Sequence, residues 1–202
     1  MEILEKLFGS STRVRVMKFF LFNPEELLDK KEIIKKTKAS SASLQKELKD
    51  LCSIGLLKKR FFIKSSQTKS GRTKKQKLQG FALNPNFKYL NNLKTLIINN
   101  EPFNHNEIIK KLNKVGKLKL IVVSGLFIQN EDSRLDLFVV GDDIKDRLVK
   151  GAISKMESEI GKELRYVFFT TADFKYRYGV CDRLVRDVFD YPHQIVVDRI
   201  GL

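Results

Sequence analysis

Apolar residues recur at helical spacing along the N-terminal quarter of the chain, and the polar clusters between them predict three short helices. The main helix is expected from about Arg13 to Phe22, because the preceding cluster Gly9-Ser10-Ser11-Thr12 supplies caps. Asp29 is expected to cap the second helix, with Glu32 at the capping-box position. This part of the chain is therefore predicted to be helical, in short pieces joined by tight turns.

The third helix is expected to begin at Ser40 or Ser41 and to end at Gly55. Apolar residues at i, i+4 and i+7 form its predicted buried stripe: Leu44, Leu48 and Leu51. Gln45 lies at the edge of the opposite face. That face is polar: Lys46, Lys49 and Ser53. The helix is thus predicted to bury one side and to present a basic side to solvent.

A β-hairpin with a basic loop is predicted after the third helix. Leu56–Ile63 is rich in Leu and Phe and favours a strand, and Lys77–Leu83 favours its return. The intervening loop, Ser65–Gln76, carries Gly71 and a cluster of Lys and Arg. One interpretation of this loop is a solvated surface, and the other is a contact with nucleic acid.

Charge divides the chain into two unlike halves. Residues 1–95 carry 22 Lys and Arg against 8 Asp and Glu, a net charge of +14, whereas residues 96–202 carry 17 against 16. Between Asp50 and Glu101 there is no acidic residue, and that stretch holds eleven Lys and Arg. A surface of one sign repels itself unless a polyanion neutralises it, so nucleic acid is the leading partner.

Three helices followed by a basic hairpin, here residues 1–84, resemble the winged helix-turn-helix domain of prokaryotic transcriptional regulators. The resemblance implies that the third helix reads base edges of double-stranded DNA in the major groove, while the hairpin follows a phosphate backbone. Gln can bind adenine with two hydrogen bonds and Lys can reach guanine or phosphate, whereas Ser43 has an alternative as a plain solvent-facing residue. The candidate DNA-binding residues are Ser41, Ser43, Gln45, Lys46, Lys49, Lys69, Arg72, Lys74 and Lys75.

Residues 85–103 are predicted to form a linker helix, because apolar residues recur there at helical spacing from Phe87 to Ile98. The apolar stripe of this helix needs a partner surface. It packs either on its own domain or against a second copy of the chain in a homodimer. The sequence leaves both alternatives open.

Residues 104–202 are predicted to form an α/β domain, which makes the whole chain α+β. The expected strands are Leu118–Ser124, Leu135–Val140, Arg165–Thr170 and a short last strand, Ile195–Val197. Helical periodicity separates the later strands, from Ile144 to Ile160 and from about Asp182 to Phe189.

Two segments of this domain resemble the core of the nucleotidyltransferase fold shared by the polymerase-β-like enzymes. They are Ser124-Gly125-Leu126-Phe127 and Ser133–Gly141. That family has a Gly-Ser pair after its first strand, Asp-x-Asp on its second strand and a third carboxylate on a neighbouring strand. The carboxylates together hold two divalent metals, because residues i and i+2 of a strand share a face.

The residues that would assemble such a two-metal site are incomplete in this chain. Arg134 occupies the first Asp position and Asp136 the second, Leu126 replaces the Ser, and Arg165–Phe169 offers no carboxylate. We therefore expect no metal, no cofactor and no enzymatic activity, with Asp136 a vestigial or structural residue. Arg134 is expected to pair with Asp136 or Asp132, or to bind an anion.

The chain as a whole resembles bacterial and archaeal transcriptional regulators that join a winged helix to a minimal nucleotidyltransferase-like domain. Phe169–Arg177 and Asp182–Val188 are similar to that group's Thr-x-x-Glu-Phe-x-x-Arg and Asp-Arg-Phe patterns, with Asp173 in place of Glu. The resemblance implies a sequence-specific DNA-binding regulator whose second domain dimerises or senses a nucleotide-like ligand. The alternatives are an active nucleotidyltransferase and an antitoxin-type module with an atypical metal site.

A cytoplasmic protein is predicted, with no membrane partner. The N-terminal residues Met1–Lys6 lack the basic and apolar regions of a signal peptide. The longest apolar run, around Leu120–Ile128, is interrupted and too short to span a bilayer. Cys52 and Cys181 lie in separate halves, which favours reduced thiols.

Overall fold

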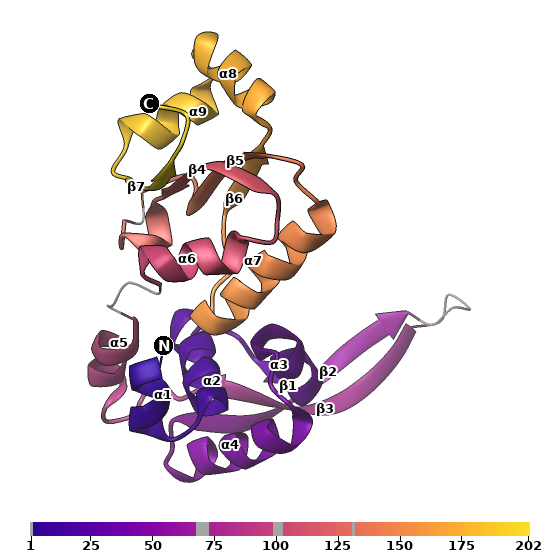
Figure 1. Ribbon diagram of the computed structural model, residues 1–202. Helices are drawn as coiled ribbons and strands as arrows, with labels where there is room; N and C mark the ends of the chain where they lie inside the picture. The colour runs from indigo at the N-terminus through magenta and orange to yellow at the C-terminus, as the bar shows by residue number, and fades with distance from the viewer. Residues whose placement is uncertain (1, 68–72, 99–102, 131) are drawn as a thin grey trace. The chain divides into compact units, whose positions relative to one another are not determined.

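The computed structural model describes residues 2–67, 73–98, 103–130 and 132–202 (Figure 1). Over these residues the chain is mixed α/β, with nine α-helices and two β-sheets, which confirms the expected combination of helices and sheets. It divides into two compact units. Unit 1 comprises Met1–Ile98 with Ser158–Lys162, and unit 2 comprises Asn99–Glu157 with Glu163–Leu202. The segment predicted as a separate linker, residues 85–103, therefore falls mostly within unit 1.

The helices of unit 1 begin where local side chains can cap them. Ser10 accepts a hydrogen bond from the backbone of Arg13, and Ser40 accepts one from Ser43. Asp29 and Glu32 form the predicted capping box at the start of the third of these helices. The helices are α1 (Glu2–Phe8), α2 (Ser11–Phe22), α3 (Lys30–Thr37), α4 (Ser41–Ser53) and α5 (Leu90–Ile98).

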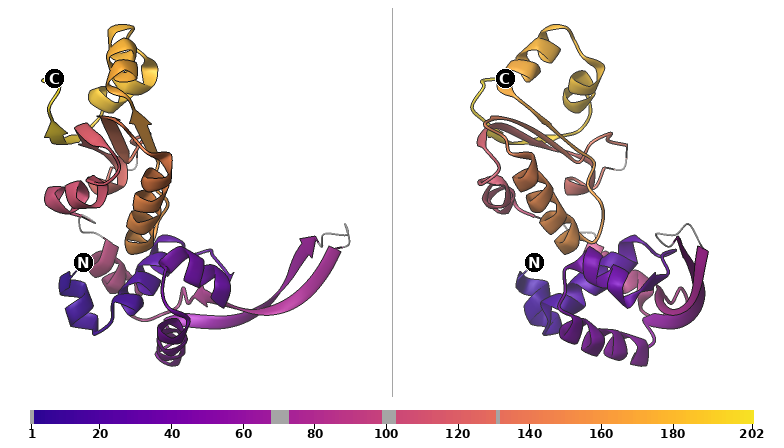
Figure 2. Two further views of the ribbon diagram at one scale, coloured as in Figure 1. Left: turned by 45° about the vertical axis from the view of Figure 1, so that its right-hand side comes forward. Right: turned by 90° about the vertical axis from the view of Figure 1, so that its right-hand side faces the viewer.

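The sheet of unit 1 is antiparallel, with strand order β1-β3-β2. Its strands are β1 (Leu28–Asp29), β2 (Leu57–Gln67) and β3 (Thr73–Leu83). The predicted loop was wrong in extent, because β2 continues to Gln67 and β3 resumes at Thr73. Ser, Gln and Lys have weak strand preferences of their own, but each new pair extends a ladder that the apolar base of the hairpin has already started. The hairpin consequently reaches well beyond the helices of unit 1 (Figures 1 and 2).

The core of unit 1 lies where the three N-terminal helices meet the base of the hairpin. Leu44, Leu48 and Leu51 of α4 are buried as predicted, and each such side chain contributes about 2 kcal/mol. They join a cluster that includes Phe20 and Phe81. The stripe of the predicted linker helix packs on this same cluster: Phe87, Leu90, Leu93 and Ile97. Of the two alternatives for that stripe, the structure shows packing on its own domain.

Unit 2 is built on a mixed sheet with strand order β6-β5-β4-β7, in which β5 and β6 are parallel and the other pairs antiparallel. Its strands are β4 (Lys117–Val123), β5 (Leu137–Asp142), β6 (Tyr166–Phe169) and β7 (Gln194–Asp198). Its helices are α6 (His105–Leu112), the short 3-10 helix η1 (Gly125–Phe127), α7 (Asp146–Ile160), α8 (Thr171–Gly179) and α9 (Arg183–Asp190).

The sheet of unit 2 is covered on both faces, which accounts for its continuously buried central strands. Alternate residues of β4 and β5 pack against α8 and α9, where Phe174 is fully buried. Helices α6 and α7 lie on the other side of the sheet from α8 and α9 (Figures 1 and 2). Within the described residues, no helix combines the length and the apolarity that a bilayer crossing requires.

Candidate nucleic-acid interface

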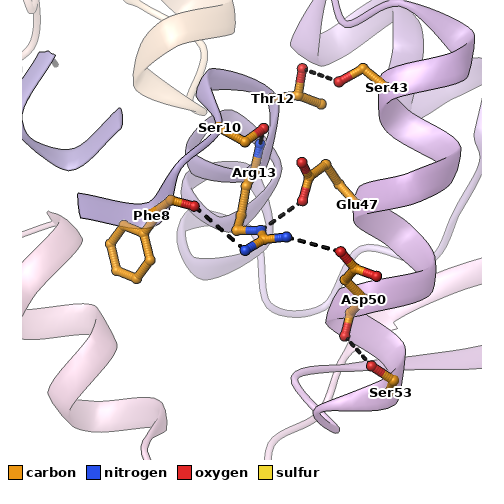
Figure 3. Close-up of polar contacts among 8 residues, drawn as sticks. All are labelled: Phe8, Ser10, Thr12, Arg13, Ser43, Glu47, Asp50 and Ser53. Atoms are coloured by element: carbon orange, nitrogen blue, oxygen red, sulfur yellow. Dashed lines mark hydrogen bonds and ion pairs between the residues drawn. The ribbon is translucent and has the colours of Figure 1, made fainter. Parts of the chain in front are cut away.

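Arg13 of α2 binds both acidic side chains of α4 (Figure 3). Its Nε donates to Glu47 at 2.6 Å and its Nη2 donates to Asp50 at 3.0 Å. Its Nη1 also donates to the carbonyl of Phe8 at 3.4 Å. Glu47 is only 4% exposed, so its charge is neutralised inside the unit. As a result, the acids of α4 turn toward α2 and the outer face of α4 keeps only neutral and positive groups.

That outer face contains four of the five α4 residues predicted to contact DNA. Ser41, Gln45, Lys46 and Lys49 are all exposed. Ser43 differs, because it is half-buried and its hydroxyl donates to Thr12 of α2 at 2.8 Å (Figure 3). Neither interpretation of Ser43 anticipated this contact, which joins two helices within the unit.

Gln45 is held at the edge of the α4 face by a neighbour from α3. The Nζ of Lys30 donates to Oε1 of Gln45 at 2.8 Å. The pair is exposed, so water or a ligand can replace this hydrogen bond at little cost. Lys30 thereby adds a cation beside the α4 face. It was missed because α3 and α4 were interpreted separately.

A groove of about 570 Å³ runs between the C-terminal half of α4 and the start of β2. Its lining holds four cations and no acid: Lys49, Lys58, Lys59 and Arg60, together with Cys52, Ser53 and Leu57. Burial raises the pKa of the Cys52 thiol, while the nearby charge of Lys59 acts to lower it. Lys58, Lys59 and Arg60 were not among the predicted site residues, although the acid-free stretch that contains them was visible in the sequence.

The hairpin is tied to the start of α3 by Lys64. Its Nζ donates to Glu32 and lies 3.3 Å from Asp29. Burial tends to raise the pKa of Asp29, but hydrogen bonds from the backbone of Glu32 and from Lys64 outweigh it, so the pKa is lowered. The pKa of Lys64 is raised, mainly by its hydrogen bond to Glu32. These contacts hold the base of β2 against α3.

The Lys64 contact should make stability depend on pH at both ends of the scale. Because the pKa of Asp29 is lowered on folding, its contribution is present above the usual carboxyl range and is lost as pH falls through the folded pKa. Because the pKa of Lys64 is raised, its contribution is lost as pH rises through the folded pKa. We expect Lys64→Met to lower the melting temperature at neutral pH and to have a smaller effect in acid. An equal effect at every pH would contradict this account.

The remaining predicted residues lie along β3 and the end of the hairpin. Lys75 is exposed on β3, and Lys74 precedes it on the same strand. Lys69 and Arg72 lie outside the described residues. The exposed cations that the structure does describe extend from α4 through the groove to the middle of the hairpin, on Lys49, Lys59 and Lys77 among others.

In unit 2, Asp136 is held by four hydrogen bonds. Its Oδ1 accepts from the backbone of Leu126 at 2.8 Å and from Arg165 Nη2 at 3.0 Å. Its Oδ2 accepts from the backbone and Nε of Arg165, at 2.8 and 3.2 Å. Asp136 is 3% exposed, and this contact raises the pKa of Arg165. Both carboxylate oxygens are thus taken up by the fold, which supports a structural role for Asp136.

The predicted partner of Arg134 was wrong. Its Nε lies 3.0 Å from Oδ2 of Asp187 on α9, and Asp136 is paired with Arg165 instead. The reason is topological, because the parallel pairing of β5 with β6 brings Arg165 to Asp136. In the part of the chain that the structure describes, no three His, Cys, Asp or Glu residues gather in an arrangement that could hold a metal.

The two C-terminal motifs cap and join helices. Thr170 accepts a hydrogen bond from the backbone of Asp173 and so caps α8. Asp182 caps α9 and accepts a hydrogen bond from Arg177 at 3.0 Å. Backbone hydrogen bonds at the start of α9, together with the charge of Arg177, lower the pKa of Asp182. No protein-family model, curated protein or solved structure matches the chain.

Proposed function

We propose that this chain is a transcriptional regulator that binds double-stranded DNA through α4 and the β2–β3 hairpin, in the manner of a winged helix. The observation that carries the proposal is the acid-free surface over these two elements. It exists because Arg13 draws Glu47 and Asp50 inward, while Lys46 and Lys49 remain exposed. Such a surface neutralises phosphates and releases their counterions.

The shape of α4 suits the major groove of a duplex. Its 13 residues span roughly 20 Å, and a single helix fits the groove width of about 12 Å. Gln45, Lys46 and Lys49 would face the base edges, where Gln suits adenine and Lys suits guanine. Lys58, Lys59 and Arg60 would then neutralise phosphates beside the groove.

Unit 2 is proposed to be a nucleotidyltransferase-like domain without transferase activity. The hydrogen bonds that saturate Asp136 support this, because a metal-binding carboxylate needs free oxygens. Its proposed task is to bring two copies of the chain together or to bind a nucleotide-like effector. A palindromic DNA site would favour the first of these tasks.

The test of the proposed function measures duplex affinity against salt concentration. We expect Lys46→Ala with Lys49→Ala to make the slope of log affinity against log salt shallower by about 0.9 for each phosphate that the variant no longer neutralises. The control removes the same charge elsewhere, by Lys88→Ala with Lys110→Ala, which are both exposed and lie off this surface.

Selection from a random duplex library completes the test. An enriched motif that weakens when Gln45 is replaced with Ala would support base reading by α4. Equal slopes for the interface variant and its control, or no enriched motif, would contradict the proposal of a sequence-specific regulator that uses α4.

A further inference from the structure

The two faces of the β2–β3 hairpin are in different environments. One face packs on unit 1: Phe62 lies so close to Gly80 that a Cβ at Gly80 would be 2.8 Å from its ring. Lys64 on the same face reaches the start of α3. This face holds the hairpin in place and is not open to a partner at these positions.

The other face exposes two large apolar side chains in the middle of the hairpin. Phe61 is 64% exposed and Ile63 is 68% exposed, and they lie two residues apart on β2. Lys77 pairs with Ile63 across the ladder, and its Nζ lies 5.1 Å from the centre of the Phe61 ring. Lys59 and Lys75 are on the same face at either end of the pair.

The charge around this apolar pair indicates its partner. A second copy of the hairpin would place like charges against Lys59, Lys75 and Lys77, which is unfavourable. A favourable occupant carries negative charge and also offers flat apolar surfaces. A base step of a duplex has both, because phosphates flank the faces of stacked bases.

We propose that Phe61 and Ile63 insert at a base step from the minor groove and bend the duplex that α4 binds. Apolar side chains, Phe and Ile among them, act in this way on DNA by partly unstacking neighbouring bases. Lys59 and Lys77 neutralise the phosphates on either side of the opened step. This inference rests on the proposed function and assigns a separate task to the hairpin, which is deformation of the DNA.

A single tryptophan reports on the insertion directly, because the chain contains no Trp. Phe61→Trp places the reporter in the apolar pair, and its emission should be quenched when a duplex binds, since the indole stacks on bases. The control is Tyr89→Trp. Tyr89 is also exposed, and Lys88 lies 5.3 Å from its ring centre, but it is away from the hairpin. Equal quenching in both variants, or no quenching in Phe61→Trp while the duplex is bound, would overturn the inference.

Bending is measured with a short duplex that carries a fluorescent donor and acceptor at its ends. The wild-type chain should bring the ends together. Phe61→Ala with Ile63→Ala should abolish that change and weaken binding about tenfold. The salt slope should stay the same, because every cation remains. Wild-type bending by the double variant would overturn the inference.

Two further arms separate the inference from the function beneath it. If the Phe61→Trp variant bound a single strand more tightly than the duplex and were quenched more strongly by it, the partner would be unpaired nucleic acid and the proposed insertion would be wrong. Loss of duplex binding in the Lys46→Ala, Lys49→Ala variant together with normal bending by the remaining bound fraction would support both proposals. If the wild-type chain binds no duplex at any salt concentration, the function and the inference are both refuted.

Discussion

Replacing Gly125 with alanine should destabilise unit 2 by about 3–5 kcal/mol, since it disturbs a buried ion pair and strains the backbone. Gly125 has a φ of +53°, a conformation that costs other residues free energy. A Cβ there would be 2.2 Å from Oδ1 of Asp136, so the carboxylate would have to move away from Leu126 and Arg165. Thermal or denaturant unfolding measures the loss.

A second glycine provides the control for this substitution. Gly151 lies within α7, and a Cβ there would meet nothing within 4 Å. Gly151→Ala should therefore stabilise the protein by about 0.5–1 kcal/mol, because alanine favours the helix. If both alanine variants had similar stability, the role assigned to the approach of Gly125 to Asp136 would be wrong.

Arg13→Ala should lower the free energy of unfolding of unit 1 by about 2–3 kcal/mol. The loss arises mainly from Glu47, which would remain buried without its partner. The Asp50 contact adds little, because that side chain is 44% exposed. The same variant should bind duplex DNA more weakly, since Glu47 and Asp50 would no longer be neutralised beside the α4 face.

A double variant separates the pair from the surrounding packing. Arg13→Met with Glu47→Leu removes both buried charges, so most of the lost stability should return. The DNA affinity of this variant should also exceed that of Arg13→Ala, because one acid is gone from α4. If the double variant were as unstable as Arg13→Ala, the destabilisation would come from poorer packing around Arg13 and not from the unpaired charge.

The accuracy of sequence-based prediction in this chain follows the distance over which each signal acts. The capping box of Asp29 and Glu32 and the cap at Ser40 were predictable, since a cap joins residues three apart. The buried stripe Leu44, Leu48 and Leu51 follows from the helical period alone. The extent of the hairpin was not predictable in this way, because Ser65–Gln67 form strand only through pairing with β3.

The sequence by itself determined the short helices, the apolar stripes, the α/β pattern and the concentration of positive charge, since each depends on neighbouring residues or on composition. The tertiary structure decided where the charges act. Arg13 binds acids 34 and 37 residues away, which leaves the α4 face free of acid. It also decided that Asp136 pairs with Arg165, 29 residues on, and that Arg134 pairs with Asp187. Such pairs depend on which strands and helices become neighbours in space, and no local pattern in the chain encodes that.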